Sequence, residues 1–161
     1  MTWTESIKNR QVDLDLLIKR VNQWRLKGET VVFTNGCFDL LHLGHLDYLA
    51  RAADLGDRLV VAINSDASVQ KIKGPERPVK DETSRAMVLS SLLYVDAIII
   101  FADETPIKLI EAINPDYLVK GGDWEVENIV GGKHVIDAGG QVISLPFLEG
   151  HSTSSLIDKI K

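Results

Sequence analysis

Five short runs rich in Val, Ile and Leu recur along the chain, and stretches with helical periodicity separate them. Runs that are almost continuously apolar, rather than alternating with polar residues, are typical of strands buried on both faces. Buried strands that alternate with helices form a parallel sheet with helices on both sides. The sequence therefore predicts an α/β fold with strands at residues 31–34, 59–64, 97–101, 117–120 and 141–145.

Helical periodicity predicts helices between and around these strands. Leu46, Leu49, Ala50 and Ala53, for example, follow the i, i+3, i+4, i+7 spacing of one helix face. The expected architecture is a Rossmann-like, doubly wound, five-stranded parallel sheet in the order 3-2-1-4-5, in a single domain. That domain is expected at residues 29–161, after a helical segment at 1–28, with 71–80 as a flexible loop. The helices are predicted at residues 12–26, 44–55, 82–94, 106–113, 126–138 and 153–160.

Composition restricts the partners and the compartment. A length of 161 residues suits one domain, and 45% hydrophobic with 25% charged residues is typical of a soluble globular protein. A net charge of -5 gives no general attraction to nucleic acid or to an anionic membrane. No apolar run reaches the roughly 18 residues of a membrane helix, and the N-terminus lacks the pattern of a signal peptide. One cysteine cannot form an intrachain disulfide. We therefore expect a cytoplasmic protein that binds neither nucleic acid nor membrane.

The segment at residues 36–45, GCFDLLHLGH, lies where the first predicted strand ends and the next helix begins. In open α/β sheets, ligands bind at the carboxyl ends of strands, where free N–H groups and the helix dipole favour phosphate. Gly36 and Gly44 would let a phosphate approach the backbone closely. His42 and His45 are three residues apart, so they would point the same way and donate hydrogen bonds to one phosphate.

Two other interpretations of this segment stay open. In the first, Asp39 is a helix N-cap and the histidines are partly buried polar residues. In the second, Asp39, His42 and His45 form a transition-metal site, because carboxylate and imidazole at three-residue steps are plausible ligands. The surrounding glycines favour phosphate over metal, and no second cluster in the sequence supplies a fourth ligand.

A second helix start of the phosphate-binding type lies near the C-terminus, in the run HSTSS at residues 151–155. Hydroxyls together with the free N–H groups of a helix make an anion site, although a serine-rich N-cap is common for structural reasons alone. Two such helix starts on parallel strands of one sheet would suit an extended triphosphate. We therefore predict a second phosphate contact at Gly150, Ser152, Thr153 and Ser154.

The basic stretch at 71–80 follows the second predicted strand, at the same edge of the sheet. It carries four cations against one acid in an acidic protein, which favours a phosphate-binding flap over a solvated surface. Arg85 opens the next predicted helix, and it is expected either to reach the same anion or to form a surface ion pair with Glu82 or Asp81.

A glycine pair follows the fourth predicted strand. Gly121 and Gly122 would permit close approach of a ligand, with Lys120 facing a phosphate and Asp123 facing a ribose. The alternative is a plain turn with Trp124 packed beneath it.

These motifs resemble a known superfamily. Gly-x-Phe-Asp followed by His-x-Gly-His, directly after a strand, is similar to the signature of the H-x-G-H nucleotidyltransferases, which include cytidylyltransferases and phosphopantetheine adenylyltransferase. The run at 150–154 resembles their second motif, G-[I]-S-[ST]-[ST], with His151 where isoleucine is frequent. The resemblance covers residues 30–160. The runs at 61–66, 71–78 and 118–123 are most similar to the adenylyltransferase domain of bacterial heptose-1-phosphate enzymes, which is often fused behind a sugar kinase.

The resemblance implies a nucleotidyltransferase of the EC 2.7.7 class that transfers AMP from ATP to heptose 1-phosphate. Its products would be ADP-heptose, used for lipopolysaccharide or other surface glycans, and pyrophosphate. The implied mechanism is direct in-line attack on the α-phosphorus without a covalent enzyme intermediate. Mg²⁺ would arrive with ATP and need few protein ligands, so no metal site built by the protein is expected. The implied partners are the two substrates, further copies of the chain in a homodimer or higher homo-oligomer, and a separate heptose 7-phosphate kinase.

The resemblance also implies roles for individual residues. The implied catalytic residues are His42, His45 and Lys73. The implied substrate-binding residues are Asp39, Lys71, Arg77 and Arg85. The implied nucleotide-binding residues are Gly36, Cys37, Phe38, His42, Gly44, His45, Lys120, Gly121, Asp123, Gly150, Ser152, Thr153 and Ser154.

Two other functions are compatible with these motifs. Glycerol-3-phosphate cytidylyltransferase, which uses CTP, is the nearest rival, but that family tends to have an arginine just before the second motif, where this chain has Phe147. A catalytically silent nucleotide-binding regulator would keep the fold without turnover. The intact His42, His45 and Lys73 argue against it.

Overall fold

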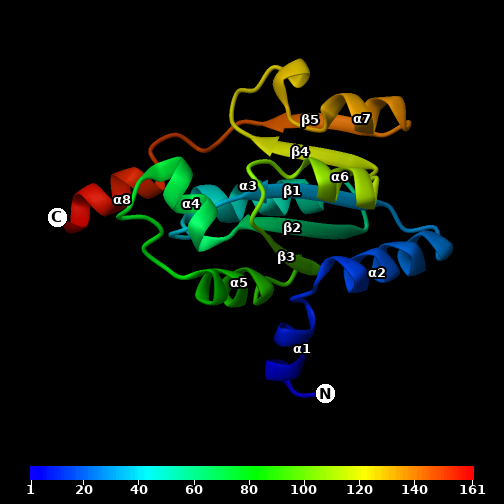
Figure 1. Ribbon diagram of the computed structural model, residues 1–161, viewed down its shortest axis with the longest axis horizontal. Helices are drawn as coiled ribbons and strands as arrows, with labels where there is room; N and C mark the ends of the chain where they lie inside the picture. The colour runs from blue at the N-terminus through cyan, green and yellow to red at the C-terminus, as the bar shows by residue number, and fades with distance from the viewer.

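The structure is a computed structural model that describes residues 1–161, and it contains one fully parallel sheet of five strands (Figure 1). The strand order, β3-β2-β1-β4-β5, confirms the predicted one. β1 is the central strand, and its Val32 pairs with Leu59 on one side and with Tyr117 on the other. The strands are β1 (Val31–Gly36), β2 (Arg58–Asn64), β3 (Ala97–Phe101), β4 (Tyr117–Gly121) and β5 (Gln141–Leu145).

The helices agree with the predicted ones except in two places. A helix at the start of the expected loop, α4, was not predicted; the Ser65 hydroxyl caps it by accepting from the N–H of Ser68 at 3.2 Å. The predicted helix at 126–138 is a short 3-10 helix and a separate α-helix, because Gly131 lies between them with a φ of 80°. The helices are α1 (Trp3–Asn9), α2 (Leu14–Leu26), α3 (Leu43–Ala53), α4 (Asp66–Lys73), α5 (Glu82–Ser90), α6 (Ile107–Ile113), η1 (Val126–Asn128), α7 (Gly132–Asp137) and α8 (Thr153–Ile160).

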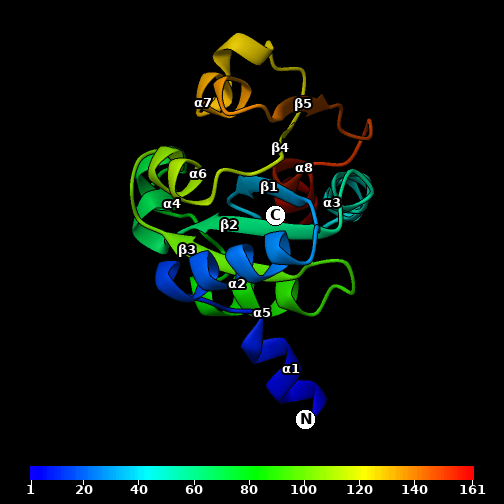
Figure 2. The same cartoon turned by 90° about the vertical axis from the view of Figure 1, so that its right-hand side faces the viewer.

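Two layers of helices cover opposite faces of the sheet. Residues of α2, α6 and α7 pack on one face, and residues of α3 and α5 pack on the other. Figure 2 shows α6 and α7 to one side of the sheet and α3 to the other. In β2, Val60 and Ala62 join the first layer while Val61 and Ile63 join the second. Burial on both faces explains why the strands are almost continuously apolar in sequence.

The N-terminal segment is only partly integrated into this core. Leu17, Val21 and Trp24 of α2 are buried, whereas α1 has no buried residue and projects from the body of the molecule (Figures 1 and 2). The link between these helices pairs with the edge strand β3, because the N–H of Val12 donates to the carbonyl of Ile98 at 2.9 Å. None of the helices combines the length and the apolar character that crossing a membrane would require.

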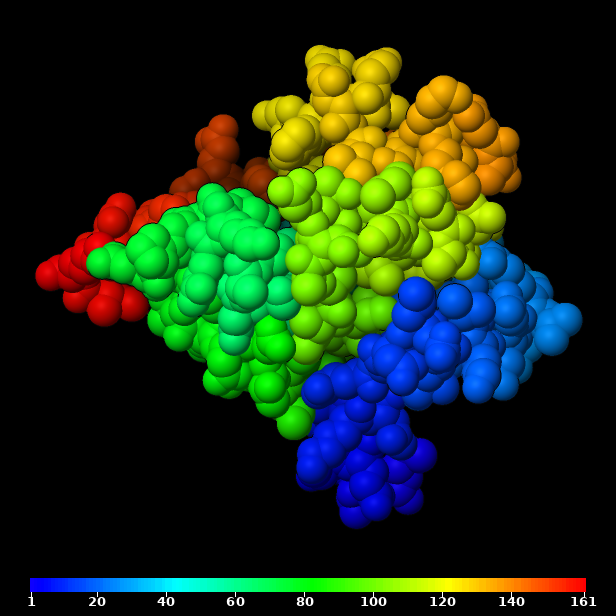
Figure 3. Space-filling model, viewed as in Figure 1, coloured from blue at the N-terminus to red at the C-terminus, as the bar shows by residue number.

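The carboxyl ends of the strands face the side of the molecule where α4 and α8 lie (Figure 1). In Figure 3, α8 is the red helix that lies against the green surface around residues 70–80. The hydroxyl of Thr153, the first residue of α8, donates to the carbonyl of Leu40 at 3.4 Å, just ahead of α3. Both predicted phosphate-type helix starts therefore lie at one edge of the sheet.

Candidate active site

The helix after β1 begins with an imidazole where a hydroxyl or carboxylate is usual. His42 is the N-cap of α3, and its Nδ1 accepts from the N–H of Gly44 at 3.1 Å. Nδ1 of His45 accepts in turn from the N–H of His42 at 3.4 Å, which completes a reciprocal capping box. The interpretation in which Asp39 caps this helix is therefore wrong.

The same bonds decide which nitrogen of each ring donates. A neutral imidazole has one donor and one acceptor nitrogen, and because Nδ1 accepts in both rings, Nε2 carries the proton. The two rings stack with their centroids 3.9 Å apart and 28° between their planes. Phe38 lies against His45, with ring centroids 5.3 Å apart. One helix start thus carries two adjacent N–H donors, an arrangement suited to phosphate oxygens.

Both imidazoles are neutral at pH 7 in the free protein. Burial, together with smaller effects of the charges of His42 and Lys73, lowers the pKa of His45 to about 4, although a hydrogen bond with the Leu40 backbone acts in the opposite direction. Burial also lowers the pKa of His42, and the charge of His151 adds to this effect. The negative charge of a bound phosphate would raise both pKa values again.

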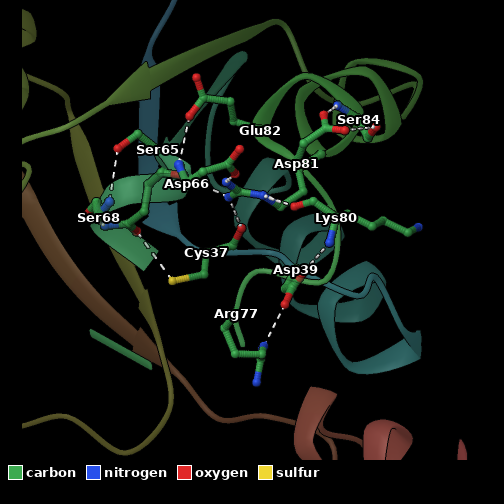
Figure 4. Close-up of polar contacts among 12 residues, drawn as sticks. Cys37, Asp39, Ser65, Asp66, Ser68, Arg77, Lys80, Asp81, Glu82 and Ser84 are labelled. Carbon is green, nitrogen blue, oxygen red and sulfur yellow. Dashed lines mark hydrogen bonds and ion pairs between the residues drawn. The ribbon is translucent and has the colours of Figure 1, made fainter. Parts of the chain in front are cut away.

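Asp39 holds the loop that follows α4. Its carboxylate accepts from the N–H of Val79 at 2.9 Å, from the N–H of Lys80 at 3.0 Å and from Nε of Arg77 at 2.7 Å (Figure 4). Burial raises the pKa of Asp39, but these hydrogen bonds together lower it by more, so the carboxylate stays ionised. The side chain is 1% exposed. The oxygens of Asp39 are therefore occupied by the protein itself, although the residue also lines a cavity at the end of β1, and its role in substrate binding stays a prediction.

Arg77 is bound to the same carboxylate from the loop. Its Nε pairs with Asp39, and its Nη2 is buried without a hydrogen-bond partner. Arg77 was predicted to bind substrate, and in the structure it anchors the loop while one nitrogen remains unused.

Arg85 is buried and hydrogen-bonded within the protein, so both predictions made for it are wrong. Its guanidinium donates to the carbonyls of Lys80, Cys37 and Asn64 at 2.8–3.0 Å and to the Asp66 carboxylate at 2.8 Å. The side chain has no exposed surface, so it neither reaches a substrate phosphate nor forms a surface pair with Glu82 or Asp81. Arg85 instead connects the ends of β1 and β2 to the loop before α5.

The structure gives no support to the metal interpretation of Asp39, His42 and His45. The Asp39 carboxylate is bound by Arg77 and by backbone amides. No group of three or more His, Cys, Asp or Glu side chains is arranged to hold a metal ion.

A small cavity of about 160 Å³ opens at the end of β1, and a larger one of about 510 Å³ adjoins it. The smaller cavity is lined by His45, Thr153 and two cations, Lys73 and Lys120. The larger cavity extends toward β3, α6 and η1. The two share seven lining residues: Asn35, Gly36, Cys37, Lys73, Lys120, Gly121 and Phe147.

The structure separates the two lysines of α4. Lys73 ends the helix and lines both cavities, and its charge acts on His45. Lys71 lies two residues earlier and, although both lysines are exposed, it lines neither cavity. Lys73 is therefore the lysine of this segment placed to contact a ligand.

The glycine pair after β4 forms one wall of the site. A Cβ at Gly121 would stand 2.6 Å from the Phe147 ring, so only glycine lets that ring approach β4 so closely. Phe147 packs edge-on against Tyr48, with ring centroids 5.9 Å apart, and lines both cavities. Sequence patterns had singled out Phe147 only as a departure from the arginine of the rival family, and they gave no signal for Tyr48.

Of the two charged residues near this turn, Lys120 lines both cavities and Asp123 lines neither. Burial lowers the pKa of Lys120, against a raising effect of Cys37, and the ammonium lies 5.6 Å from the centre of the Trp124 ring. Asp123 is exposed and lines neither cavity, so the structure does not bring it to the other predicted nucleotide-binding residues.

The hydroxyl residues at the start of α8 lie in three different environments. Ser152 caps the helix by accepting from the N–H of Ser155 at 3.0 Å. Thr153 faces the smaller cavity. Ser154 lies on a separate surface hollow beside Lys73 and Arg77. Gly150 precedes the helix with a φ of 78°, a conformation that favours glycine.

A model of the cytidylyltransferase-like family matches residues 33–159. The bifunctional protein HldE of Photobacterium profundum is 57% identical over 145 residues, which is 90% of this chain and 30% of that protein. HldE of Vibrio cholerae O395 is 54% identical over 147 residues, 91% of this chain and 31% of that protein. The chain thus spans about a third of the length of these curated relatives.

Two solved structures share the fold. The lipopolysaccharide core biosynthesis protein from Thermoplasma volcanium is 30% identical, has a TM-score of 0.61, and is covered completely by 77% of this chain. A pantoate-beta-alanine ligase from Francisella tularensis, crystallised with beta-gamma ATP and beta-alanine, also has a TM-score of 0.61 over 89% of this chain and 68% of that one. At 15% identity, the second likeness concerns the fold alone.

Proposed function

This chain belongs to the cytidylyltransferase-like family of nucleotidyltransferases, an enzyme family of the EC 2.7.7 class, and we propose that its reaction is adenylyl transfer from ATP to heptose 1-phosphate. The products would be ADP-heptose and pyrophosphate. The strong similarity to HldE and the likeness to a lipopolysaccharide core biosynthesis protein support this choice within the family.

The observation that carries the proposal is the imidazole capping box of α3 beside a cationic cavity. His42 uses Nδ1 to cap the helix, which leaves its Nε2–H as a donor, and the His45 ring stacks beside it at the edge of the smaller cavity. Lys73 and Lys120 line the cavity next to His45. Neutral donors and cations gathered at a helix N-terminus are what a polyphosphate requires.

We propose that the chemistry is a single in-line displacement. An oxygen of the sugar phosphate forms the new bond to the α-phosphorus, the bond from that phosphorus to the bridging oxygen breaks, and pyrophosphate leaves with the electron pair. Such reactions depend mostly on positioning and on charge stabilisation. We assign His45 to the α-phosphate in the transition state and His42 to the triphosphate. Lys73 is assigned to the leaving pyrophosphate or to the sugar phosphate.

Mg²⁺ is the proposed cofactor, and we propose that it arrives bound to ATP. Mg²⁺ keeps several waters and often binds through substrate phosphates and only one or two carboxylates, so it needs no cage of protein ligands. The donor set of this site, imidazoles and ammonium groups, suits the phosphates rather than the ion. When bound, Mg²⁺ would neutralise charge on the leaving pyrophosphate.

The larger cavity is the proposed place for the sugar. It adjoins the phosphate-binding cavity through Lys73 and Lys120, and polar groups that suit hydroxyls, those of Asn64, Glu104 and Asn128, line it. The indole of Trp124 also lines it and offers an apolar face. Phe147 gives the base an apolar surface where the glycerol phosphate branch tends to have arginine, which supports a purine.

The test is product identification from the purified chain with ATP, Mg²⁺ and heptose 1-phosphate. We expect one pyrophosphate and one ADP-heptose per ATP consumed. Cytidylyl transfer to glycerol 3-phosphate in a parallel reaction with CTP would identify the rival enzyme instead. Tight nucleotide binding with no pyrophosphate from either pair would identify a silent regulator.

We also propose two partners. The first is a second copy of the chain in a homo-oligomer, which sedimentation of the purified chain would test. The second is a heptose 7-phosphate kinase activity upstream of this one. The relatives of about three times this length are named bifunctional, which supports a second activity working with this domain.

A further inference from the structure

The loop before α8 brings a third imidazole to the start of α3. A Cβ built on Gly44 would stand 3.3 Å from Cβ of His151, so this side chain lies directly against the first turn of α3. The hydrogen bond from Thr153 to the Leu40 carbonyl holds the same two loops together. His151 thus lies just before α8 in the chain, and in space it lies beside the start of α3, which His42 caps.

His151 has no structural task that explains its presence there. It is exposed, and it makes neither a hydrogen bond nor an ion pair within the protein. Its charge lowers the pKa of His42, after burial, so the two side chains lie close enough for their charges to interact. Placing a second basic group beside His42 is unfavourable in the empty protein and becomes favourable when an anion lies between them.

The position of His151 relative to the two inner imidazoles indicates which part of a ligand it would meet. His45 lines the smaller cavity, whereas His42 and His151 lie outside that lining, toward the two helix starts. An extended triphosphate with its α-phosphate at His45 would place its outer phosphates at His42 and His151. Those outer phosphates become the pyrophosphate that leaves.

We propose that His151 is a third phosphate-binding residue, which donates a hydrogen bond to the β- or γ-phosphate of the nucleotide and to pyrophosphate. The proposal rests on the proposed function for the presence of a triphosphate, but not on the identity of the sugar or of the base. It predicts a ligand preference: His151 should matter for ATP and for pyrophosphate and should not matter for AMP, which lacks the outer phosphates.

Titration calorimetry with ATP, AMP and inorganic pyrophosphate tests this without any turnover. His151→Phe keeps an aromatic side chain at this position and removes the donor, and we expect it to weaken ATP and pyrophosphate binding about 10-fold, the range for one charge-assisted hydrogen bond. AMP binding should change less than 2-fold. His151→Gln keeps an N–H donor, so it should recover most of the loss.

His134→Phe is the matched control, because His134 lies on α7 and pairs with Asn114 at 2.6 Å, away from both helix starts. It should leave all three affinities unchanged. Unchanged pyrophosphate binding in His151→Phe, or an equal loss for AMP and ATP, would overturn the proposal. The expected pattern in a chain that fails to adenylate heptose 1-phosphate would uphold His151 and reject the sugar assignment, so the two failures are distinguishable.

Discussion

The imidazole rings of His42 and His45 stack with their centroids 3.9 Å apart, and each ring accepts a backbone hydrogen bond through Nδ1 at the start of α3. The two side chains that cap the helix are therefore the same two that we propose as phosphate donors. Protonating both rings at this separation would be unfavourable, and burial lowers both pKa values as well. The free protein thus presents two neutral imidazoles beside the cations Lys73 and Lys120.

Replacement of His45 by alanine should lower kcat by about 10²- to 10⁴-fold, the range for losing one positioned donor to the transition state. The affinity for ATP should fall by much less, because His42 and the lysines still bind the triphosphate. Steady-state kinetics of pyrophosphate release would measure both effects. A variant that binds ATP poorly but keeps its turnover would show that His45 serves binding rather than the transition state.

The stability of the protein should depend on pH through His45. Its pKa is about 4 in the folded chain and has an ordinary value of 6.5, so between these values the unfolded chain binds a proton that the folded chain does not. Stability is therefore complete above about pH 6.5 and declines as the pH falls toward 4, by on the order of 1–2 kcal/mol at pH 5.

Urea unfolding at pH 7.5 and pH 5, on the original chain and on His45→Gln, would measure this contribution. Glutamine does not titrate, so the difference between the two pH values should shrink in the variant. An identical pH dependence in both proteins would mean that His45 is not the group that titrates.

Replacing each of the two lysines of α4 should affect catalysis differently, although the sequence predicts a phosphate contact for both. Lys73 lines both cavities, and its replacement by alanine should cost about 2–4 kcal/mol of transition-state stabilisation. Lys71 is exposed on the same helix and is the matched control, for which we expect nearly unchanged kcat/KM. Equal losses in both variants would indicate a general effect of charge rather than a contact from Lys73.

Arg85 should matter for stability rather than for catalysis. Its guanidinium donates to three carbonyls and one carboxylate and is fully buried, so Arg85→Leu leaves those acceptors without partners. We expect a loss of about 3–5 kcal/mol in the free energy of unfolding. Lys133→Ala, which removes the exposed pair with Asp137, should change it little. A fully stable Arg85→Leu protein that has lost activity would restore the substrate-binding role predicted for Arg85.

The sheet could be predicted from the sequence because burial on both faces leaves a signal in every strand. The run Ala97–Phe101 is apolar at each position, and its neighbours show helical periodicity on either side. Helix α4 was missed because its residues, including Lys71 and Lys73, are mostly polar. Only two of them, Ser68 and Val69, are buried, so the sequence shows no apolar helix face. The stretch 71–80 therefore looked like a loop from its first residue.

The sequence predicted which residues would lie together at this edge of the sheet, but not which internal partners each of them would have. The positions of His42, His45 and Thr153 follow from motifs at the ends of strands, where the topology itself brings them together. The tasks of Asp39 and Arg85 depend on partners far away in the chain: Asp39 on residues 77–80, and Arg85 on Cys37 and the end of β2. Local sequence carries no record of such long-range hydrogen bonds, so it assigned both residues to substrate binding without indicating these internal partners.

The choice of nucleotide is the most direct test of adenylyl transfer to heptose 1-phosphate. The measurement is kcat/KM for ATP and for CTP, side by side, with saturating heptose 1-phosphate and Mg²⁺. Phe147, which packs edge-on against Tyr48 and lines both cavities, gives a purine an apolar surface and gives cytosine no charged donor. We expect binding to favour ATP by at least about 1.4 kcal/mol, tenfold, and turnover to favour it by more. Equal or better activity with CTP would contradict the heptose assignment and point to the cytidylyltransferase.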